Sequence, residues 1–435
     1  MAFEQSTHAH PKTRKRIAII GGGISGLGAA WKLSEHHNVT LFESEAELGG
    51  HARTRMAGPN RDIPVDTGFM VFNDATYPHL LELFAELDVP SVPTTMSFAV
   101  SLDDGRFEYA LSNPKRIFSD PKNILSPKFW GMIRDIFKFN KNAQIAFENP
   151  DLTLGELLDQ MGVGTYFRQN YLFPLAGAIW STARQDIENF PATSFVRFFH
   201  NHGLLSALKG PQWRTVVGGS KVYVDKLHAA LVSKSVTLKL NTEVLQAGRS
   251  PTPWVMLENG DQEKFDEIIF ACHSNQALEI LSDASLKEKS LLSDIKYRPN
   301  RVILHGDTSH MPKRKAAWSS WVYRGKSNEI ETDGSFTYWM NLLQHISDDT
   351  PVFVTLNPKG PIADDLIYDE TTLWHPQFNV SALRAQNRMV EIQGPTNIWF
   401  CGAYMRYGFH EDGLMSGVEI AKSLNEKYAN PVAKV

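Results

Sequence analysis

The chain has 435 residues, of which 42% are hydrophobic and 21% are charged, a composition that predicts a soluble globular protein long enough for two domains. A net charge of −4 argues against a general nucleic-acid binder. The two cysteines, Cys272 and Cys401, provide neither a disulfide framework nor a cysteine-rich metal site, which fits a reducing cytoplasm. The polar segment 1–13 predicts a flexible tail. The sequence lacks a run of about 18 apolar residues, so no membrane span is predicted.

Residues 17–28, IAIIGGGISGLG, predict a buried strand that breaks into a glycine turn and continues as a helix. In this G-x-G-x-x-G spacing, Gly21 allows the tight turn, Gly23 lets the backbone approach a pyrophosphate, and Gly26 lets the helix pack closely on the strand. The amides that open the helix face the phosphates, with the positive end of the helix dipole behind them. An ordinary strand-turn-helix corner can use the same glycines, so the sequence around the motif must show whether it binds a dinucleotide.

Two downstream features supply that context. A second short strand ends at Glu43, where a carboxylate can accept hydrogen bonds from a ribose, or is simply an exposed acid at a strand end. Residues 47–54, ELGGHART, form a second glycine turn with basic groups. A domain that binds only NAD does not need this turn, whereas FAD needs further backbone near its phosphates and ribityl chain. The sequence therefore predicts FAD. Residues 61–72 are expected either to pass near the flavin or to form a plain hairpin.

The segment 114–147 is basic and aromatic, and it leaves two interpretations open. It combines seven lysines and arginines with many large apolar residues, including Trp130 and Phe137. Such a segment suits the surface of an anionic bilayer, where rings lie at the headgroup boundary and cations meet phosphates. The alternative is a helix that packs on the core and has a basic outer face.

Several helices are predicted in the middle of the chain. Residues 77–87 have an amphipathic period, and 152–161 form a helix with a capping box. The apolar stretch 166–180 predicts a buried helix broken at Pro174, and 190–205 predict an aromatic-rich helix. Within the last, His200 and His202 point to different faces and have no third ligand nearby, so no metal site is predicted.

From Val216 the first domain is predicted to resume with a glycine turn, a helix and several strands, of which WVMLENG and FDEIIFACH continue one sheet. In flavin domains, the strand at Val244 commonly lies along the adenine. The strand-rich residues 301–356 give a sheet that can roof a substrate cavity, with one face of the segment Tyr338 to Met340 lining the cavity or else packing in the core. At the end, a strand opens into Gly402 and a helix from about Leu414 points its N-terminus at the flavin.

These motifs together resemble the superfamily of flavin-containing amine oxidases and phytoene desaturases. The resemblance rests on IAIIGGGISGLGAAWKL, ESEAELGGHARTR, FDEIIFACH and FCGAYMRYGFHEDGLMSGVEIA, and it covers nearly the whole chain. Within the superfamily, PKRKAAWSSWVY, TYWMNLLQ, VTLNP and GFHEDG resemble a bacterial subgroup of FAD-binding proteins associated with cyclopropane and furan fatty acid metabolism. Two positions depart from the superfamily pattern, because His51 stands where arginine is usual and Ala403 where an acid usually binds the ribityl chain.

The predicted fold is α/β, with a discontinuous Rossmann-type FAD domain and a mixed sheet-plus-helix substrate domain. The FAD domain comprises 14–72, 213–275 and 393–428, and the substrate domain comprises 73–212 and 276–392. The predicted cofactor contacts are Gly21, Gly23, Ile24, Ser25, Gly26, Glu43, Ser44, Gly49, Gly50, His51, Arg53, Thr54, Gly68, Phe69, Val244, Gly402, Ala403, Gly413 and Leu414. The resemblance places His410 beside the flavin, where its imidazole could act as a base, with Glu411 and Tyr404 as alternatives.

The resemblance implies an FAD-dependent oxidoreductase that transfers a hydride from a hydrophobic substrate to the flavin. The favoured substrate is a methyl-branched fatty acyl chain of a membrane lipid, which would be desaturated or oxidised. Two alternatives stay open: a flavin amine oxidase, and a non-catalytic FAD-binding partner of a lipid methyltransferase. The expected location is cytoplasmic, with peripheral contact to the inner face of the membrane through 114–147, and no nucleic-acid partner is expected.

Overall fold

The computed structural model describes residues 14–111, 114–149, 151–180, 187–201, 205, 210–327 and 334–429, so the predicted tail lies outside the described residues. The chain divides into two compact units. Unit 1 comprises Met1–His51, Tyr223–Ile295 and Arg384–Val435, and unit 2 comprises Ala52–Val222 and Lys296–Leu383. The predicted FAD domain overlaps mainly with unit 1, but its residues 52–72 and 213–222 fall in unit 2.

A five-stranded parallel sheet forms the centre of unit 1. Its strand order is β10-β2-β1-β14-β20, and every neighbouring pair is parallel. The strands are β1 Arg16–Ile20, β2 Asn38–Phe42, β10 Thr237–Lys239, β14 Glu267–Phe270 and β20 Ile398–Phe400. The apolar run IAII of β1 and the segment EIIF of β14, apolar after Glu267, are buried along their length, as a parallel sheet covered on both faces requires. The α/β class predicted from the sequence is confirmed.

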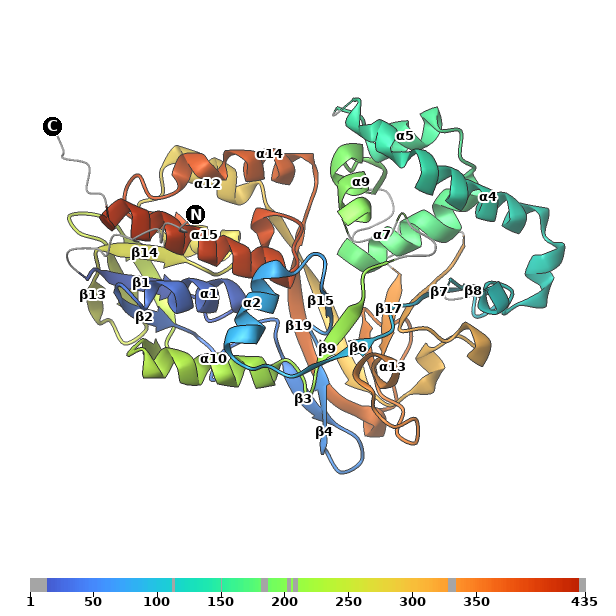
Figure 1. Cartoon of the computed structure of the whole chain (residues 1–435), viewed down its shortest axis with the longest axis horizontal. Coiled ribbons are helices and arrows are strands. Elements are labelled where there is room, and N and C mark those ends of the chain that lie inside the picture. Colours follow the sequence, from blue (N-terminus) through green and yellow to red (C-terminus); the bar gives the residue numbers. More distant parts are fainter. Residues whose placement is uncertain are drawn as a thin grey trace, which may run out of the picture. The chain divides into compact units, whose positions relative to one another are not determined.

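Helices from three parts of the chain lie wholly or partly in this unit (Figure 1). They are α1 Ile24–Leu33, α10 Lys221–Ser233, α11 Ser274–Ile280, α12 Leu286–Ser293, α14 Val380–Arg388 and α15 His410–Ala429, with the 3₁₀ turns η7 Met389–Ile392 and η8 Ala403–Met405. Helix α15 begins at His410, not near Leu414 as predicted. The carboxylate of Asp412 accepts hydrogen bonds from the amides of Tyr407 and Phe409, which closes the preceding loop and starts the helix earlier.

The sequence predicts that the segment WVMLENG continues the parallel sheet, and this prediction is wrong. The segment forms β12 Trp254–Leu257 in a separate antiparallel sheet with β11 Val244–Gly248 and β13 Gln262–Lys264. The reason is a tight turn after β12, in which Gly260 has φ +84° and the amide of Leu257 donates to the carbonyl of Asp261. The chain therefore folds back on itself before it reaches β14.

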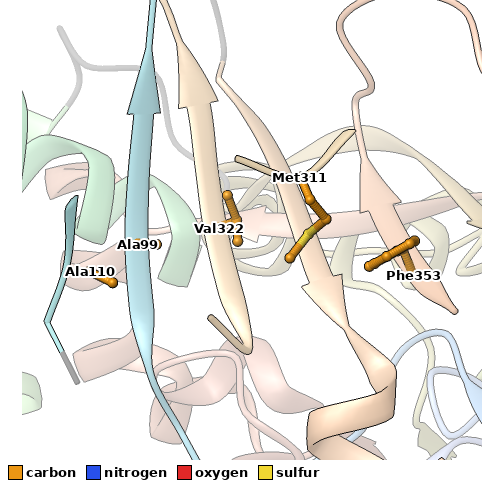
Figure 2. Close-up of a cluster of buried hydrophobic side chains, with 5 residues drawn as sticks. All are labelled: Ala99, Ala110, Met311, Val322 and Phe353. Carbon is orange, nitrogen blue, oxygen red and sulfur yellow. The ribbon is translucent and has the colours of Figure 1, made fainter. Parts of the chain in front are cut away.

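Unit 2 is built on a seven-stranded sheet with the order β19-β15-β18-β17-β16-β7-β8. Its strands are β7 Phe98–Leu102, β8 Phe107–Ala110, β15 Lys296–His305, β16 Trp321–Gly325, β17 Ser335–Trp339, β18 Phe353–Leu356 and β19 Ile367–Gln377. On one face, Ala99, Ala110, Met311, Val322 and Phe353 form a buried cluster, and Figure 2 shows these side chains over neighbouring strands. The strand-rich character predicted for 301–356 is thus observed, with the additional strands coming from distant segments.

Unit 2 also contains several short strands, helices and turns outside the seven-stranded sheet. The strands are β3 Thr54–Ala57, β4 Ile63–Asp66, β5 Phe72–Asn73, β6 Ser91–Thr94 and β9 Trp213–Val216. The helices are α2 Pro78–Glu86 and α13 Met340–Gln344, and the 3₁₀ turns are η4 Thr308–His310, η5 Lys315–Ala317 and η6 Asp364–Leu366. Strands β3 and β4 pair antiparallel, so the first part of 61–72 belongs to a hairpin. The predicted amphipathic helix at 77–87 corresponds to α2.

The helical part of unit 2 runs from 114 to 201 (Figure 1, teal to green). Its elements are α3 Pro114–Ile117, η1 Pro121–Leu125, α4 Pro127–Asn142, η2 Ala143–Phe147, α5 Leu154–Gln160, α6 Thr165–Phe167, the π-helical turn η3 Arg168–Leu172, α7 Phe173–Trp180 and α9 Ala192–Asn201. The capping box predicted for α5 is present, with Thr153 and Glu156 bonding each other's backbone amides. None of the described helices is long and apolar enough to cross a bilayer.

The predicted break at Pro174 is wrong, because the helical run continues through it from η3 into α7. Proline has no N–H, so the carbonyl of Asn170, four residues earlier, loses its usual helical donor. The hydroxyl of the buried Tyr109 donates to this carbonyl at 2.6 Å. The π-helical turn directly before Pro174 also departs from the regular pattern there. A side chain from β8 therefore compensates for the proline.

Candidate functional site

The carboxyl ends of the parallel strands bring most predicted cofactor residues of unit 1 together. Since neighbouring strands of this sheet are all parallel, the segments that follow them emerge at one edge. The first glycine turn follows β1, Glu43 follows β2, His273 follows β14 and Gly402 follows β20. This edge is where open α/β sheets bind their ligands.

The three glycines of the first turn have different surroundings, and these fit a dinucleotide. Gly21 has φ +113°, and a Cβ there would lie 2.8 Å from the carbonyl oxygen of Ala271. A Cβ on Gly26 would lie 2.0 Å from the carbonyl oxygen of Gly21. Nothing lies within 4 Å of the corresponding position at Gly23, the partly exposed residue that precedes α1. The space in front of the amino end of α1 is therefore open, as a pyrophosphate requires.

The second glycine turn lies directly on the first. The amide of Gly49 donates to the carbonyl of Gly22 at 2.9 Å, and a Cβ on Gly50, which has φ +57°, would lie 3.2 Å from Cα of Gly23. The sequence predicts that both turns lie near the phosphates of the cofactor, and in the structure the backbones of the two turns are hydrogen-bonded to each other. Additional amides thus border the open space at Gly23.

Glu43 is part of this arrangement and not an isolated surface acid. Its Oε2 accepts a hydrogen bond from the amide of Gly22 at 2.6 Å, and its Oε1 accepts from the amide of Glu45 and from the hydroxyl of Ser44. These bonds fix the carboxylate beside the first turn. An ionised carboxylate offers about four lone-pair sites, so acceptor capacity remains for a ribose.

The residues of α1 and α15 predicted to contact the cofactor also pack against each other. A Cβ on Gly413 would lie 2.9 Å from the side chain of Ile24, and one on Gly417 would lie 2.1 Å from the carbonyl of Ser25. The side chain of Leu414 is buried and would clash with any Cβ on Gly28. Since these side chains fill the contact between the helices, what they can offer a cofactor is their backbone.

His410 lies at the start of α15 in a buried group of aromatic side chains. Its Nε2 is 2.6 Å from the hydroxyl oxygen of Tyr223, which lies on α10. Burial, with a smaller contribution from the charge of His51, lowers the pKa of His410 to about 3. The rings of His51 and His273 are 6.0 Å apart, and burial lowers the pKa of His273 to about 3 as well. The pKa of His410 is therefore well below the value of about 6.5 that an imidazole has in water.

Sequence reasoning missed Tyr223 and His273. His273 ends the motif FDEIIFACH, directly after a predicted strand of the sheet, and its position at a strand's carboxyl end was an available signal. Tyr223 belongs to an ordinary amphipathic helix, and nothing local distinguishes it.

The other predicted residues of unit 1 are mostly buried. Glu411 and Tyr404, the alternatives to His410 as a base, are both buried, and Ala403 is the first residue of η8, directly after Gly402. Val244, predicted near the adenine, is buried at the start of β11.

Four of the predicted cofactor residues belong to unit 2, where two of them already have polar partners. The guanidinium of Arg53 donates to both carboxylate oxygens of Asp369, at 2.6 and 3.0 Å. The hydroxyl of Thr54 donates to Asp66, which also accepts from the amide and hydroxyl of Ser220. Burial raises the pKa of Asp66 to about 6. The other two residues, Gly68 and Phe69, are half-buried.

Within the described residues, no group of three or more His, Cys, Asp and Glu side chains could hold a metal ion. His200 lies at the end of α9, and His202 lies outside the described residues.

The site defined by these two glycine turns belongs to a known class of protein. Residues 24–366 match the family described as flavin containing amine oxidoreductase, and the chain belongs to this family. Membership confirms the resemblance seen in the sequence, the FAD cofactor and the oxidoreductase class. The residues that would hold FAD are the glycines of both turns, the amides opening α1, and Glu43.

Particular relatives share parts of the sequence or the whole fold. The carotenoid phi-ring synthase of Chlorobaculum tepidum is 33% identical over 134 residues, which are 30% of this chain and 20% of the relative. The chain thus spans about a fifth of the length of that curated relative. A conjugated-linoleic-acid-producing fatty acid isomerase from P. acnes has a TM-score of 0.67 at 15% identity, covering 94% of this chain and 98% of its own. Cyclohexylamine oxidase from Brevibacterium oxydans has a TM-score of 0.66 at 15% identity, covering 96% and 100%. These two structures share the fold.

Proposed function

We propose that this protein desaturates or oxidises methyl-branched fatty acyl chains of membrane lipids. The observation that carries the proposal is an apolar face of the seven-stranded sheet in unit 2. Because residues paired across neighbouring strands point to the same face, the strand register defines two rows. One row consists of Phe98, Trp321, Tyr338, Val354 and Leu304, and the next of Val100, Tyr323, Phe336, Leu356 and Val302.

Both rows consist of apolar and aromatic side chains, which suits a hydrocarbon chain and offers no charge to an ammonium group. Eight of the ten side chains are buried, so the surface left for a ligand on these rows is that of Trp321 and Tyr338, which are half-buried. Their rings are 5.3 Å apart in an edge-to-face contact. The indole Nε1 of Trp321 is buried and has no hydrogen-bond partner among the described residues. A buried donor without a partner costs about 1–3 kcal/mol, and the carbonyl oxygen of an acyl group would accept from it.

The reaction removes a hydride from one carbon of the acyl chain and a proton from its neighbour, which leaves a double bond. FAD, when bound, supplies a two-electron acceptor for the hydride, and dioxygen or another acceptor then takes the electrons. His410 is neutral at pH 7 because its pKa is about 3, so it is able to accept a proton, although burial makes it a weaker base than a free imidazole. Its contact with Tyr223 fixes the orientation of the ring.

A second candidate is a flavin amine oxidase, which the family description and the fold shared with cyclohexylamine oxidase favour. The fold shared with a fatty acid isomerase is compatible with the lipid proposal. The remaining alternative is a non-catalytic FAD-binding partner of a lipid methyltransferase.

One experiment separates the three. The purified protein is mixed anaerobically with phospholipid carrying methyl-branched acyl chains, with the unbranched lipid, or with primary amines, and loss of the oxidised flavin absorbance is followed. We expect reduction by the branched lipid. Reduction by amines alone would establish the amine oxidase, and no reduction by either class would favour the non-catalytic partner.

A further inference from the structure

A group of exposed apolar and basic side chains on η1, α4 and η2 of unit 2 remains without a role in the proposed reaction. The apolar members are Ile124, Leu125, Trp130, Phe137, Ile145 and Phe147, and the basic members are Lys122, Arg134, Lys138 and Lys141. We call these residues the η1–α4 face. We propose that the η1–α4 face docks the protein on an anionic phospholipid bilayer.

Helix α4 has one face that belongs to the core and one that does not. Phe129, Met132, Ile136 and Phe139 are buried. On the other side, Trp130, Arg134, Phe137 and Lys141 follow one another at spacings of three and four residues, so they form one stripe along the helix. The outer face is thus not merely basic, since large apolar side chains alternate with the cations along it.

The apolar side chains of the η1–α4 face are substantially exposed. Leu125 is 85% exposed, Phe137 61% and Trp130 49%. Burying such side chains removes apolar surface from water and so stabilises an association. A gathering of this kind on one surface marks an interaction site.

A rigid scaffold presents the face. Glu108 is fully buried and pairs with Arg314, whose second terminal nitrogen lies 3.1 Å from Asp120. Asp120 in turn caps η1 by accepting from the amide of Lys122. The indole Nε1 of Trp130 donates to the carbonyl of Ile124, which joins η1 to α4. The exposed residues therefore stand on a fixed platform and not on a loop that could fold them inward.

Charge identifies the occupant. Arg134, Lys138 and Lys141 lie on the same side of α4 as Trp130, and Lys122 lies on the preceding η1. The η1–α4 face is therefore locally opposite in sign to the whole chain, which carries a net charge of −4. Among the described residues, no carboxylate lies within ion-pair distance of Lys122, Lys138 or Lys141. An anionic bilayer satisfies both components, because phosphates meet the cations while the apolar side chains enter the headgroup boundary. A second copy of the same face would bring like charges together.

The test measures sedimentation of the full-length, FAD-loaded protein with vesicles of phosphatidylcholine alone or with about one-third phosphatidylglycerol. We expect binding to the anionic vesicles only, weakening as salt rises. Each basic residue near such a surface contributes about fivefold to binding. Replacing Lys122, Lys138 and Lys141 by glutamate removes three attractive charges and adds three repulsive ones, so it should weaken binding by at least about 100-fold. The matched control replaces the exposed Lys264, Lys289 and Lys359, which should have a much smaller effect at the same change in net charge.

A second pair of variants tests the apolar component. Leu125→Ser with Phe137→Ser should weaken binding at least about tenfold and leave the melting temperature unchanged, because both side chains are exposed. The control pair is Leu286→Ser with Val390→Ser, which are 87% and 75% exposed in unit 1 and should bind as wild type does.

The proposal concerns binding alone, so it can fail while the proposed reaction stands. It is overturned if the wild type does not bind anionic vesicles at low salt, or if the control lysine variant loses as much binding as the test variant. It is also overturned if the protein self-associates through Leu125 and Phe137 in solution without binding vesicles, because the occupant would then be a second copy.

Discussion

The parallel sheet of unit 1 and the seven-stranded sheet of unit 2 present their recognition groups in different ways. In unit 1 the groups are backbone amides in glycine turns at the ends of strands, held by Gly21, Gly23 and Gly49. In unit 2 they are side chains on a sheet face whose strands come from segments as distant as 98–102 and 321–325. A backbone site is therefore encoded locally, whereas a side-chain face depends on long-range strand register.

If unit 1 depends on backbone geometry, Gly26→Val should have the largest effect of any single change considered. Its Cβ would lie 2.0 Å from the carbonyl oxygen of Gly21, and neither the strand nor α1 can move without breaking the sheet edge. We expect a loss of more than about 3 kcal/mol of unfolding free energy and little folded protein. Circular dichroism and expression in the soluble fraction measure this. A variant that folds with an unchanged melting temperature would show that the close approach of α1 is dispensable.

Gly23→Val sharpens the contrast, because the same substitution three residues earlier meets open space. We expect the fold to survive and the dissociation constant for FAD to rise by about 10³-fold, since the side chain would displace the pyrophosphate from amides worth about 1.5–3 kcal/mol each. Yellow colour, flavin released on denaturation and the melting temperature without FAD are the measurements. Equal FAD retention in Gly23→Val and wild type would place the pyrophosphate elsewhere.

The same contrast explains how much the sequence could predict. The glycine spacing, Glu43 and the capping box of α5 are local patterns, and each led to the right fold element. The continuation of the helix through Pro174 could not be read, because it depends on Tyr109, 61 residues away in sequence. The low pKa of His410 depends on burial and the proximity of His51, neither of which has a sequence signal.

His410→Ala tests whether a side chain adds chemistry to the backbone site of unit 1. We expect FAD to be retained and flavin reduction by the true substrate to slow by about 10²-fold, the usual range for a lost general base. Because the pKa of His410 is about 3, the wild-type rate should show no inflection near pH 6.5 from this group. Tyr223→Phe should slow the reaction less, since it removes only the orienting hydroxyl. Wild-type rates in His410→Ala would direct attention to Glu411 and Tyr404.

The last prediction concerns His305, which is fully buried in unit 2 on the sheet face that also carries Phe353. The amide of Asp307 donates to its Nδ1, so the proton lies on Nε2 and is donated to the hydroxyl of Thr355 at 2.7 Å. Burial, reinforced by the charge of His310, lowers the pKa of His305 to about 3, whereas the unfolded chain has an ordinary value of about 6.5.

The unfolded state therefore binds a proton between pH 6.5 and 3 that the folded state does not bind. The stabilisation associated with neutral His305 is complete above pH 6.5 and is lost as the pH falls toward 3, by at most about 1.4 kcal/mol per pH unit. His305→Gln keeps a donor for Thr355 but cannot take up a proton, so its unfolding free energy in urea should fall less steeply than that of wild type between pH 6.5 and 5. If His305→Gln keeps the wild-type slope, the imidazole must be protonated within the folded sheet, and the neutral arrangement inferred from Asp307 and Thr355 would be incorrect.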